Sequence, residues 1–284
     1  MHQLRDIFRY RELIRLLTVT AVKLRYKGSF LGFLWSLINP LLLMVVFYFV
    51  FVVLLPNSAQ QGCTEVVAPG ASTKQVQDAI SCKIYSHYLS FILIGILAWN
   101  FTASAVSVSL TSLLGNAAII KKVYFPREVF PISAVLAQLV NFILALIPLF
   151  LVILLSGIQP GFYALLLPVV IFFHLLFLTG LALLFSVMTL YFRDLIVIME
   201  VLLQAWFFVS PVIYSMQQVF KDGAQVVYWL NPMASFIETY RTILFFNYPP
   251  DFGFTLRTCL SGVVVFALGY GFFMWKRKQI GQLI

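Results

Sequence analysis

The chain of 284 residues is 62% hydrophobic and only 10% charged, whereas soluble globular domains carry about 25% charged residues. This composition excludes an ordinary soluble enzyme or binding domain. The net charge of +9 does not indicate a nucleic-acid-binding protein, because the excess basic residues lie in short segments beside apolar runs, where they set membrane orientation and meet lipid headgroups.

The first 29 residues precede the first apolar run and are rich in arginine. Apolar side chains recur on one face with helical spacing, while Arg5, Arg9 and Glu12 lie opposite. This pattern predicts an amphipathic interfacial helix over 1–29 that lies in the headgroup plane. The alternative is a simple basic tail that directs topology, and the length of the segment favours the helix. No cleavage site for a signal peptide follows.

Six apolar runs come next, each nearly free of charge and long enough to cross a bilayer, which takes about 20 helical residues. The alternating short segments of a membrane β-barrel are absent, so we expect helices. The fold class is therefore an all-α polytopic membrane protein, with a single domain over 1–284. The expected spans are 30–55, 89–114, 132–156, 162–191, 195–214 and 258–275.

Basic residues cluster on one side of such a six-span arrangement: in 1–27, in 121–127, at Arg193 and in 276–278. The positive-inside rule assigns this side, and with it both termini, to the cytoplasm. The protein is thus expected to be a multi-pass membrane protein.

The stretch 226–246 is apolar enough to suggest a seventh span, but it contains Asn231-Pro232, Glu238 and Arg241. A seventh span would also place the closing Lys-Arg-Lys outside. We therefore expect re-entrant external helices between the fifth and sixth spans, where broken backbone is tolerated inside protein.

Cys63 and Cys82 both lie in the polar external loop after the first span. An oxidising compartment would allow a disulfide between them, and two free thiols are the alternative. Glu65 and Asp78 in the same loop are the only candidates for a paired acid site.

The spans contain few groups for chemistry. No glycine is followed by lysine, so the chain has no Walker A loop and any ATP hydrolysis belongs to another polypeptide. His174 is expected to be a hydrogen-bonded packing residue, because no second ligand lies at metal-binding spacing. Glu200 and Gln204 share one face of the fifth span and predict a polar path or a helix interface; a snorkelling carboxylate is the alternative.

The cytoplasmic loop between the second and third spans combines charges, large apolar side chains and two prolines. An ordinary solvated turn would not keep consecutive large apolar residues, so the loop is expected to dock a cytosolic partner. Its residues are Lys121, Lys122, Val123, Tyr124, Phe125, Pro126, Arg127 and Glu128.

Three motifs resemble those of membrane subunits in the ABC-2 polysaccharide exporter family, which export O-antigen, teichoic acid and capsule. The first runs from Leu24 to Trp35, includes Arg25-Tyr26-Lys27 of the interfacial (gate) helix, and is followed by Asn39-Pro40. The second, from Lys122 to Glu128, looks like the family's coupling helix, and the third is Tyr191-Phe192-Arg193-Asp194. The resemblance extends over nearly the whole chain, although the cysteine-bearing loop is longer than expected.

The resemblance implies a homodimer with two ABC ATP-binding subunits, which hold ATP and Mg, while this chain carries no cofactor. It also implies a path at the dimer interface, bounded by the first and fifth spans, for a lipid-linked polysaccharide. Aromatic rings suit the apolar faces of sugars, although most aromatics in a membrane protein face lipid. The expected path residues are Trp35, Tyr48, Phe51, Glu200, Gln204, Trp206 and Tyr214.

The sequence thus predicts the transport subunit of a polysaccharide exporter and not an enzyme. An ABC-2 exporter of another substrate, such as teichoic acid, capsule, a lipid or a drug, is the first alternative. A membrane glycosyltransferase or acyltransferase is the second, and it would need a cluster of carboxylates or histidines at a membrane face.

Overall fold

The computed structural model describes residues 10–28, 34–50, 79, 82–84, 87–122, 125–215, 231–250 and 252–283. All regular structure in these ranges is helical, so the predicted all-α class is confirmed for them. Four helices are long and apolar enough to cross a membrane. They are α5 (Tyr88–Thr111), α7 (Val129–Leu155), α8 (Leu167–Tyr191) with the 3-10 turn η5 (Phe162–Leu166) before it, and α13 (Phe252–Leu283).

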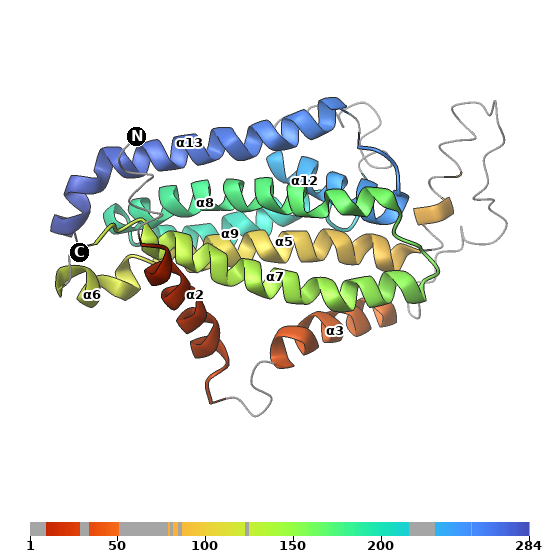
Figure 1. The fold of residues 1–284 in the computed structure, drawn as a ribbon, viewed down its shortest axis with the longest axis horizontal. Helices are drawn as coiled ribbons and strands as arrows, with labels where there is room; N and C mark the ends of the chain where they lie inside the picture. The colour runs from red at the N-terminus through yellow and green to blue at the C-terminus, as the bar shows by residue number, and fades with distance from the viewer. Residues whose placement is uncertain are drawn as a thin grey trace.

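These four helices lie side by side in an elongated bundle (Figure 1). The predicted spans at 89–114, 132–156 and 162–191 correspond within about one turn at each end to α5, to α7, and to η5 together with α8, because runs without charged residues define all three. The helix α13 is longer at both ends than the span predicted at 258–275. It begins before Arg257 and continues past the basic residues 276–278.

Two further apolar helices are shorter. The helix α9 (Leu195–Val209) begins where the fifth span was predicted but ends early. Its last residue is followed by Ser210, which is extended (φ −86°, ψ 141°) because it precedes Pro211. The helix α3 (Trp35–Tyr48) occupies the middle of the predicted span 30–55. The described residues therefore contain four helices of spanning length and two shorter apolar ones.

The helix α2 (Arg11–Tyr26) is the described part of the predicted interfacial helix. It packs against α7 and crosses it steeply (Figure 1). Ile14 and Thr18 are buried in this contact, whereas Arg11 and Arg15 are exposed. The helix α3 packs against α7 and α5, so α2 and α3 both lie against α7.

Short helices complete both ends of the bundle. After α5, the turn η4 (Leu114–Asn116) and the helix α6 (Ala117–Lys122) lead toward α7. We call this end, which also holds the last turns of α13, the basic end (Figure 1). In the other half of the bundle, α12 (Pro232–Arg241) continues into the π-helical turn η6 (Thr242–Phe246), which ends at Asn247 with left-handed backbone (φ 56°).

Large apolar side chains cover the outside of the bundle. They follow a helical stripe on α7, and a similar row runs along α13. An outward-facing apolar surface over buried polar groups is the reverse of a soluble protein and suits a lipid environment. The stripe on α7 consists of Ile143, Ile147, Leu151 and Leu154.

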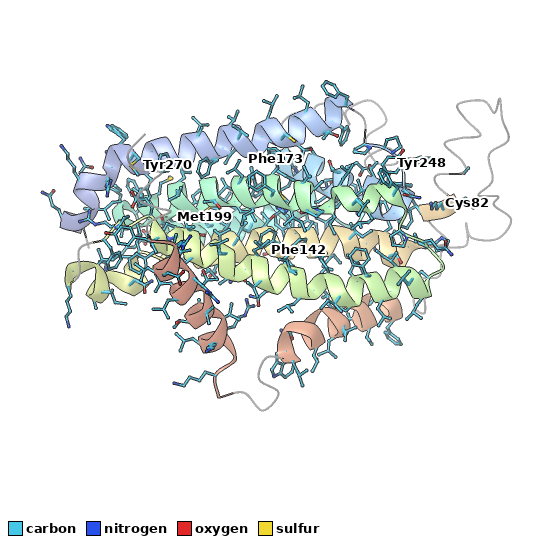
Figure 2. The ribbon with its side chains drawn as sticks, viewed as in Figure 1. Cys82, Phe142, Phe173, Met199, Tyr248 and Tyr270 are labelled. Atoms are coloured by element: carbon cyan, nitrogen blue, oxygen red, sulfur yellow. The ribbon has the colours of Figure 1, made fainter. Side chains whose placement is uncertain are left out.

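His174 lies at the centre of the bundle and joins three helices. Its Nε2 lies 2.9 Å from Thr102 Oγ1 on α5, and its Nδ1 lies 3.2 Å from the hydroxyl of Tyr240 on α12. Its ring also stacks on Phe236. The prediction that His174 is a hydrogen-bonded packing residue is confirmed. Nearby, Phe142 lies inside the bundle (Figure 2) and contributes to the same aromatic core.

The helices α8 and α13 pack closely because glycines lie at their contact. A Cβ added to Gly269 would lie 2.0 Å from the carbonyl oxygen of Gly180, and one added to Gly180 would lie 2.4 Å from that of Val265. Small residues at such contacts let helix backbones approach each other in a membrane, where packing replaces the hydrophobic effect. The two helices thus form a tightly packed pair.

Candidate functional site

A polar stripe runs along α5. Asn100, Ser104, Ser107 and Thr111 are spaced four, three and four residues apart, which places them on one face of the helix. All four are at least partly exposed and line two adjoining cavities within the chain. The opposite face of α5 is packed with buried apolar side chains.

A second group of polar side chains faces this stripe from α7 and α2. Arg25, near the end of α2, donates from Nη1 to Oε1 of Gln138 at 2.9 Å. Asn141, one turn along α7 from Gln138, donates to the same oxygen at 3.2 Å. Gln138 is buried and accepts both bonds, so the three side chains form one connected cluster.

We call the two adjoining cavities, which meet at Arg25, Ser104, Gln138 and Asn141, the polar groove. One cavity of 490 Å³ lies between α3, α5 and α7, and the other, of 740 Å³, lies between α2, α5 and α7. Trp35 and Asn39 of α3 line the first cavity. Apolar groups make up most of the surface of both cavities, and the polar groups among them are amides, hydroxyls, one guanidinium and one indole. Such polar groups bind sugar hydroxyls, and an aromatic ring packs on the apolar face of a sugar.

The predicted path residues fall into different places. Trp35 lines the polar groove. Glu200 and Gln204 are exposed on α9, on a face that no described element of the chain covers. Phe51 and the side chain of Tyr48 lie outside the described residues.

Trp206 and Tyr214 make contacts within the chain near the end of α9. The indole of Trp206 donates to Asn231 Oδ1 at 2.9 Å and packs edge-to-face on Trp99 of α5. The hydroxyl of Tyr214 donates to the carbonyl of Phe208 at 3.1 Å. The structure therefore does not bring Trp206 and Trp35 together. Trp206 packs on α5 and bonds to Asn231 just before α12, whereas Trp35 begins α3 and lines the polar groove.

The remaining residues of the interfacial helix and the cysteine loop are only partly described. Lys27 is exposed just after α2, and the side chain of Tyr26 lies outside the described residues. Cys82 is buried and disulfide-bonded, but Cys63 lies outside the described residues, so the predicted pairing stays a prediction. Cys259 is free.

The predicted docking loop, which we call the coupling segment (121–128), lies at the basic end. Lys121 and Lys122 end α6 and are exposed. Val123 and Tyr124 lie outside the described residues. Phe125 is half-buried with its ring 5.4 Å from that of Phe130, and Pro126 is buried.

Arg127 and Glu128 of the coupling segment face α13. Arg127 donates from Nη1 to the carbonyl oxygen of Arg277 at 2.7 Å. Glu128 is only 2% exposed, and its Oε1 lies 3.6 Å from Nε of Arg277. Their predicted role in docking a partner remains a prediction, and both already have partners within the chain.

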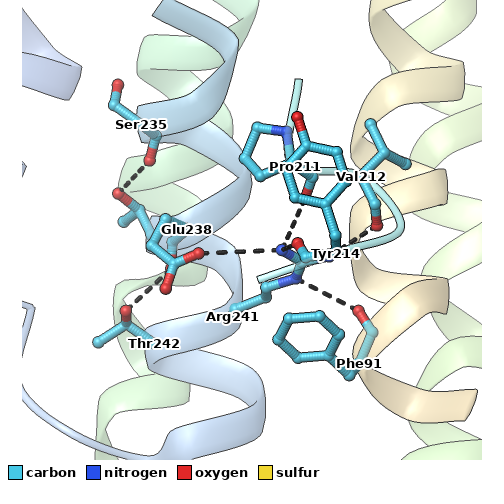
Figure 3. Close-up of polar contacts among 9 residues, drawn as sticks. Phe91, Pro211, Val212, Tyr214, Ser235, Glu238, Arg241 and Thr242 are labelled. Atoms are coloured by element: carbon cyan, nitrogen blue, oxygen red, sulfur yellow. Dashed lines mark hydrogen bonds and ion pairs between the residues drawn. The ribbon is translucent and has the colours of Figure 1, made fainter. Parts of the chain in front are cut away.

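A buried arginine organises the end of α9. Arg241, at the end of α12, is fully buried and donates to the carbonyls of Pro211 and Val212 at 2.6 Å each, and to those of Tyr214 and Phe91 at 3.2 and 3.3 Å (Figure 3). Carbonyls just past a helix end lack intrahelical partners. Arg241 supplies those partners where α9 stops.

Burial and the neighbouring Glu238 act on the charge of Arg241 in opposite directions. Its Cζ lies 3.7 Å from the ring centre of Phe91, and Glu238 lies 3.9 Å away. Burial lowers the pKa of Arg241 to about 10, while Glu238 opposes this shift. The guanidinium is therefore protonated at neutral pH and donates all of these bonds.

Sequence reasoning missed the polar groove. Among its residues only Arg25 and Trp35 were predicted as site residues, because Asn100 and the serines and threonines in the second half of α5 were counted simply as part of an uncharged span. The signal was in the spacing: Asn100, Ser104, Ser107 and Thr111 recur on one helical face, and Gln138 and Asn141 are three residues apart.

The chain was compared with known proteins. A family model described as ABC-2 type transporter matches residues 12–245. An "O-antigen export system permease protein RfbA" from Myxococcus xanthus is 29% identical over 282 residues, which cover 99% of this chain and 98% of that protein. Two proteins of the same name from Klebsiella pneumoniae are 28% and 27% identical, each over 96% of this chain and 95% of its own length.

Proposed function

Because the chain belongs to the ABC-2 type transporter family, we propose that it is the membrane subunit of an ATP-driven exporter that moves a lipid-linked polysaccharide of the O-antigen kind. The names of its three full-length relatives, all O-antigen export permeases, support this substrate class. In this proposal the chain is one membrane domain of six spans in the bacterial inner membrane. The basic end, with both termini, faces the cytoplasm.

The polar groove is the observation that carries the proposal. Polar side chains at membrane depth are costly unless they meet water, protein or a polar substrate. Asn100 and Ser104 of the stripe line one cavity together with the amides of Gln138 and Asn141 and the indole of Trp35. These amides and hydroxyls can bind the hydroxyl groups of a sugar polymer, and the apolar side chains between them can pack on sugar faces.

In this proposal the path runs between two copies of the chain and includes the polar groove of each. The helices α3 and α9, which correspond to the first and fifth predicted spans, both pack on α5, beside Asn100 and Trp99 respectively. The outer face of α9 exposes Glu200 and Gln204. A two-fold axis would place this face opposite its counterpart, so that both carboxylates border the path and stay hydrated.

Energy comes from a second polypeptide in this proposal. Two copies of an ABC ATP-binding subunit hold ATP and Mg and dock on the coupling segment of each membrane subunit. Exposed Lys121 and Lys122 set the register of this contact, and Tyr124 and Phe125 supply the apolar anchors. The membrane subunit contributes the path and no catalytic residue.

The proposal is tested by purifying the chain with the ATPase encoded beside it and measuring ATP hydrolysis and glycan export in vesicles. Asn100→Leu and Ser104→Leu should each lower export by about tenfold while ATPase association persists, because bulk and lost hydroxyl or amide groups block the groove. Ala267→Leu, on the exposed face of α13, is the matched control and should export normally.

Two results would contradict the proposal. One is unchanged export in both groove variants, which would exclude the groove from the path. The other is a purified chain that transfers sugar or acyl groups without moving the polymer across the vesicle membrane, which would indicate the transferase alternative.

The dimer path has its own test. A cysteine at Glu200 should react with a small hydrophilic thiol reagent in the assembled complex, because the path is wet. A cysteine at Leu151, on the apolar stripe of α7, should react only with a lipid-soluble reagent. Equal protection of both cysteines from the hydrophilic reagent would place Glu200 outside the path.

A further inference from the structure

The coupling segment is joined to the far end of the chain. Arg127 donates to the backbone of Arg277, and the side chain of Arg277 lies 3.6 Å from Glu128. Both contacts bridge 149 to 150 positions of sequence and depend on α13 continuing past its apolar run. Gly281 completes the junction, because a Cβ there would lie 2.6 Å from Nη2 of Arg127.

The end of α13 is packed and is not a solvated tail. A helix of 32 residues is about 48 Å long, whereas a bilayer core takes about 30 Å. The extra turns bury Ile280 completely, in a cluster with Phe273 and Phe130 against which Phe125 packs. The hydroxyl of Tyr191, at the end of α8, donates to Gln279.

Glu128 is placed for an internal contact and not for a partner. Its side chain is 3% exposed, compared with 33% for that of Arg277. A buried carboxylate whose opposite charge is removed is strongly unfavourable, so the position of Glu128 depends on Arg277 staying in place. The other carboxylate oxygen of Glu128, Oε2, is buried without a hydrogen-bond partner among the described residues. The positive charge of Arg277 is therefore the main interaction that offsets the cost of burying this carboxylate.

We infer that Arg127 and Glu128 are positioning residues that lock the coupling segment to the C-terminal end of α13, so that the two move as one body when the ATPase changes shape. The inference rests on the proposed function, since it assigns a role within ATP-driven export. The C-terminal turns are then part of the coupling machinery, although they contain none of the three family-like motifs.

The helix α13 connects this lock to distant parts of the bundle. Along its length it packs on α8 through Gly180 and Gly269. In the other half of the bundle, the hydroxyl of Thr258 donates to Ser235 of α12 at 3.2 Å. Thr258 and Arg277 are about 28 Å apart along the helix. A displacement of the coupling segment therefore moves a helix that contacts α12, the element that holds the end of α9.

Charge exchange tests the lock. In the complex reconstituted with its ATPase, Glu128→Arg and Arg277→Glu should each lower the amount of glycan exported per ATP hydrolysed by about tenfold. The double variant should recover to within about threefold of the unmodified complex, because the pair is restored with reversed polarity. Lys278→Glu, which makes the same charge change on an exposed neighbour, is the control and should behave as the unmodified chain.

If the double variant is as uncoupled as Glu128→Arg alone, Glu128 acts on another partner and the inference is wrong. A complex that never binds ATPase or never exports glycan, even without substitutions, would instead overturn the proposed function. The two failures are thus distinguishable in one set of samples.

A second pair of variants covers the case in which charge reversal prevents folding. Gly281→Leu leaves every charge in place and displaces only the guanidinium of Arg127, so it should also lower export per ATP. Gly271→Leu, two to three turns earlier in α13 with nothing within 4 Å of its added Cβ, should not. Equal export by these two variants would overturn the lock.

Discussion

At the scale of single residues, Arg241 is costly to bury, yet it supplies hydrogen bonds to the backbone where α9 ends. A fully buried guanidinium is tolerated because four carbonyls and the face of Phe91 surround it. Gly95 of α5 leaves the necessary space, since a Cβ there would lie 2.5 Å from the carbonyl oxygen of Val212. Arg241 thus fixes the chain where α9 ends.

Arg241→Lys should lower the free energy of unfolding by about 3 kcal/mol, because an ammonium keeps the charge but leaves at least two buried carbonyls without donors. The measurement is the midpoint of thermal unfolding of the purified chain in detergent. Arg193→Lys, at an exposed position, is the matched control and should leave the midpoint unchanged. A midpoint for Arg241→Lys equal to that of the control would show that the carbonyls find other donors.

At the scale of elements, the pairing of α8 and α13 depends on backbone contact. Gly180 and Gly269 lie opposite each other, and the backbone of the facing helix occupies the space that a side chain at either position would need. Gly262 repeats the arrangement about two turns from Gly269, with its added Cβ 2.7 Å from the carbonyl of Phe173. The pair is therefore stiff, which is what the transmission proposed along α13 requires.

Gly269→Leu should separate α8 from α13 and lower the yield of folded chain, with a loss of about 3 kcal/mol or more, because the nearest obstacle is backbone and not a flexible side chain. Gly271→Leu, two residues away in open space, should fold normally. Size-exclusion profiles of the two variants give the comparison, and similar profiles would show that the helix pair tolerates a wider separation.

The sequence predicts a helix end well where neighbouring residues determine that end, and poorly where distant residues do. The ends of α5, α7 and α8 follow from apolar runs, and the motif at Tyr191 coincides with the end of α8. The end of α9 was missed because Pro211 was taken as part of the span, although a proline signals a break. The last turns of α13 were missed because Ile280 is stabilised by Phe130, which is distant in sequence.

In the candidate site, too, local features were predicted and contacts between distant segments were not. The coupling segment was predicted from a local conflict between charges and aromatics. Its attachment to Arg277 was not, because nothing in either segment indicates the other. The polar groove needed a test of spacing within each span and then the packing of α2, α3 and α7 around α5.

At the scale of the whole molecule, the positions of charges predict orientation. Exposed Lys278 lies at the basic end, and exposed Tyr248 follows η6 in the other half of the bundle. Their separation lets one reagent distinguish the two sides of the membrane.

In a chain with Cys259→Ser, Tyr248→Cys should react with a membrane-impermeant thiol reagent in intact spheroplasts, whereas Lys278→Cys should react only after lysis. The positive-inside rule is the physical reason. The opposite labelling pattern would invert the molecule and place the coupling segment beyond the reach of a cytoplasmic ATPase.

The enclosure of α12 also bears on how the chain is made. During synthesis α12 leaves the ribosome before α13, yet its Ser235 and Thr239 hydroxyls are bonded to Thr258 of α13. Until the last helix arrives, these hydroxyls have only their bonds to backbone carbonyls within α12, and the helix that carries Arg241 has an open side. The C-terminal helix therefore completes the fold last, and a chain that ended before residue 252 would leave one side of α12 uncovered, although α5 and α8 still pack on it.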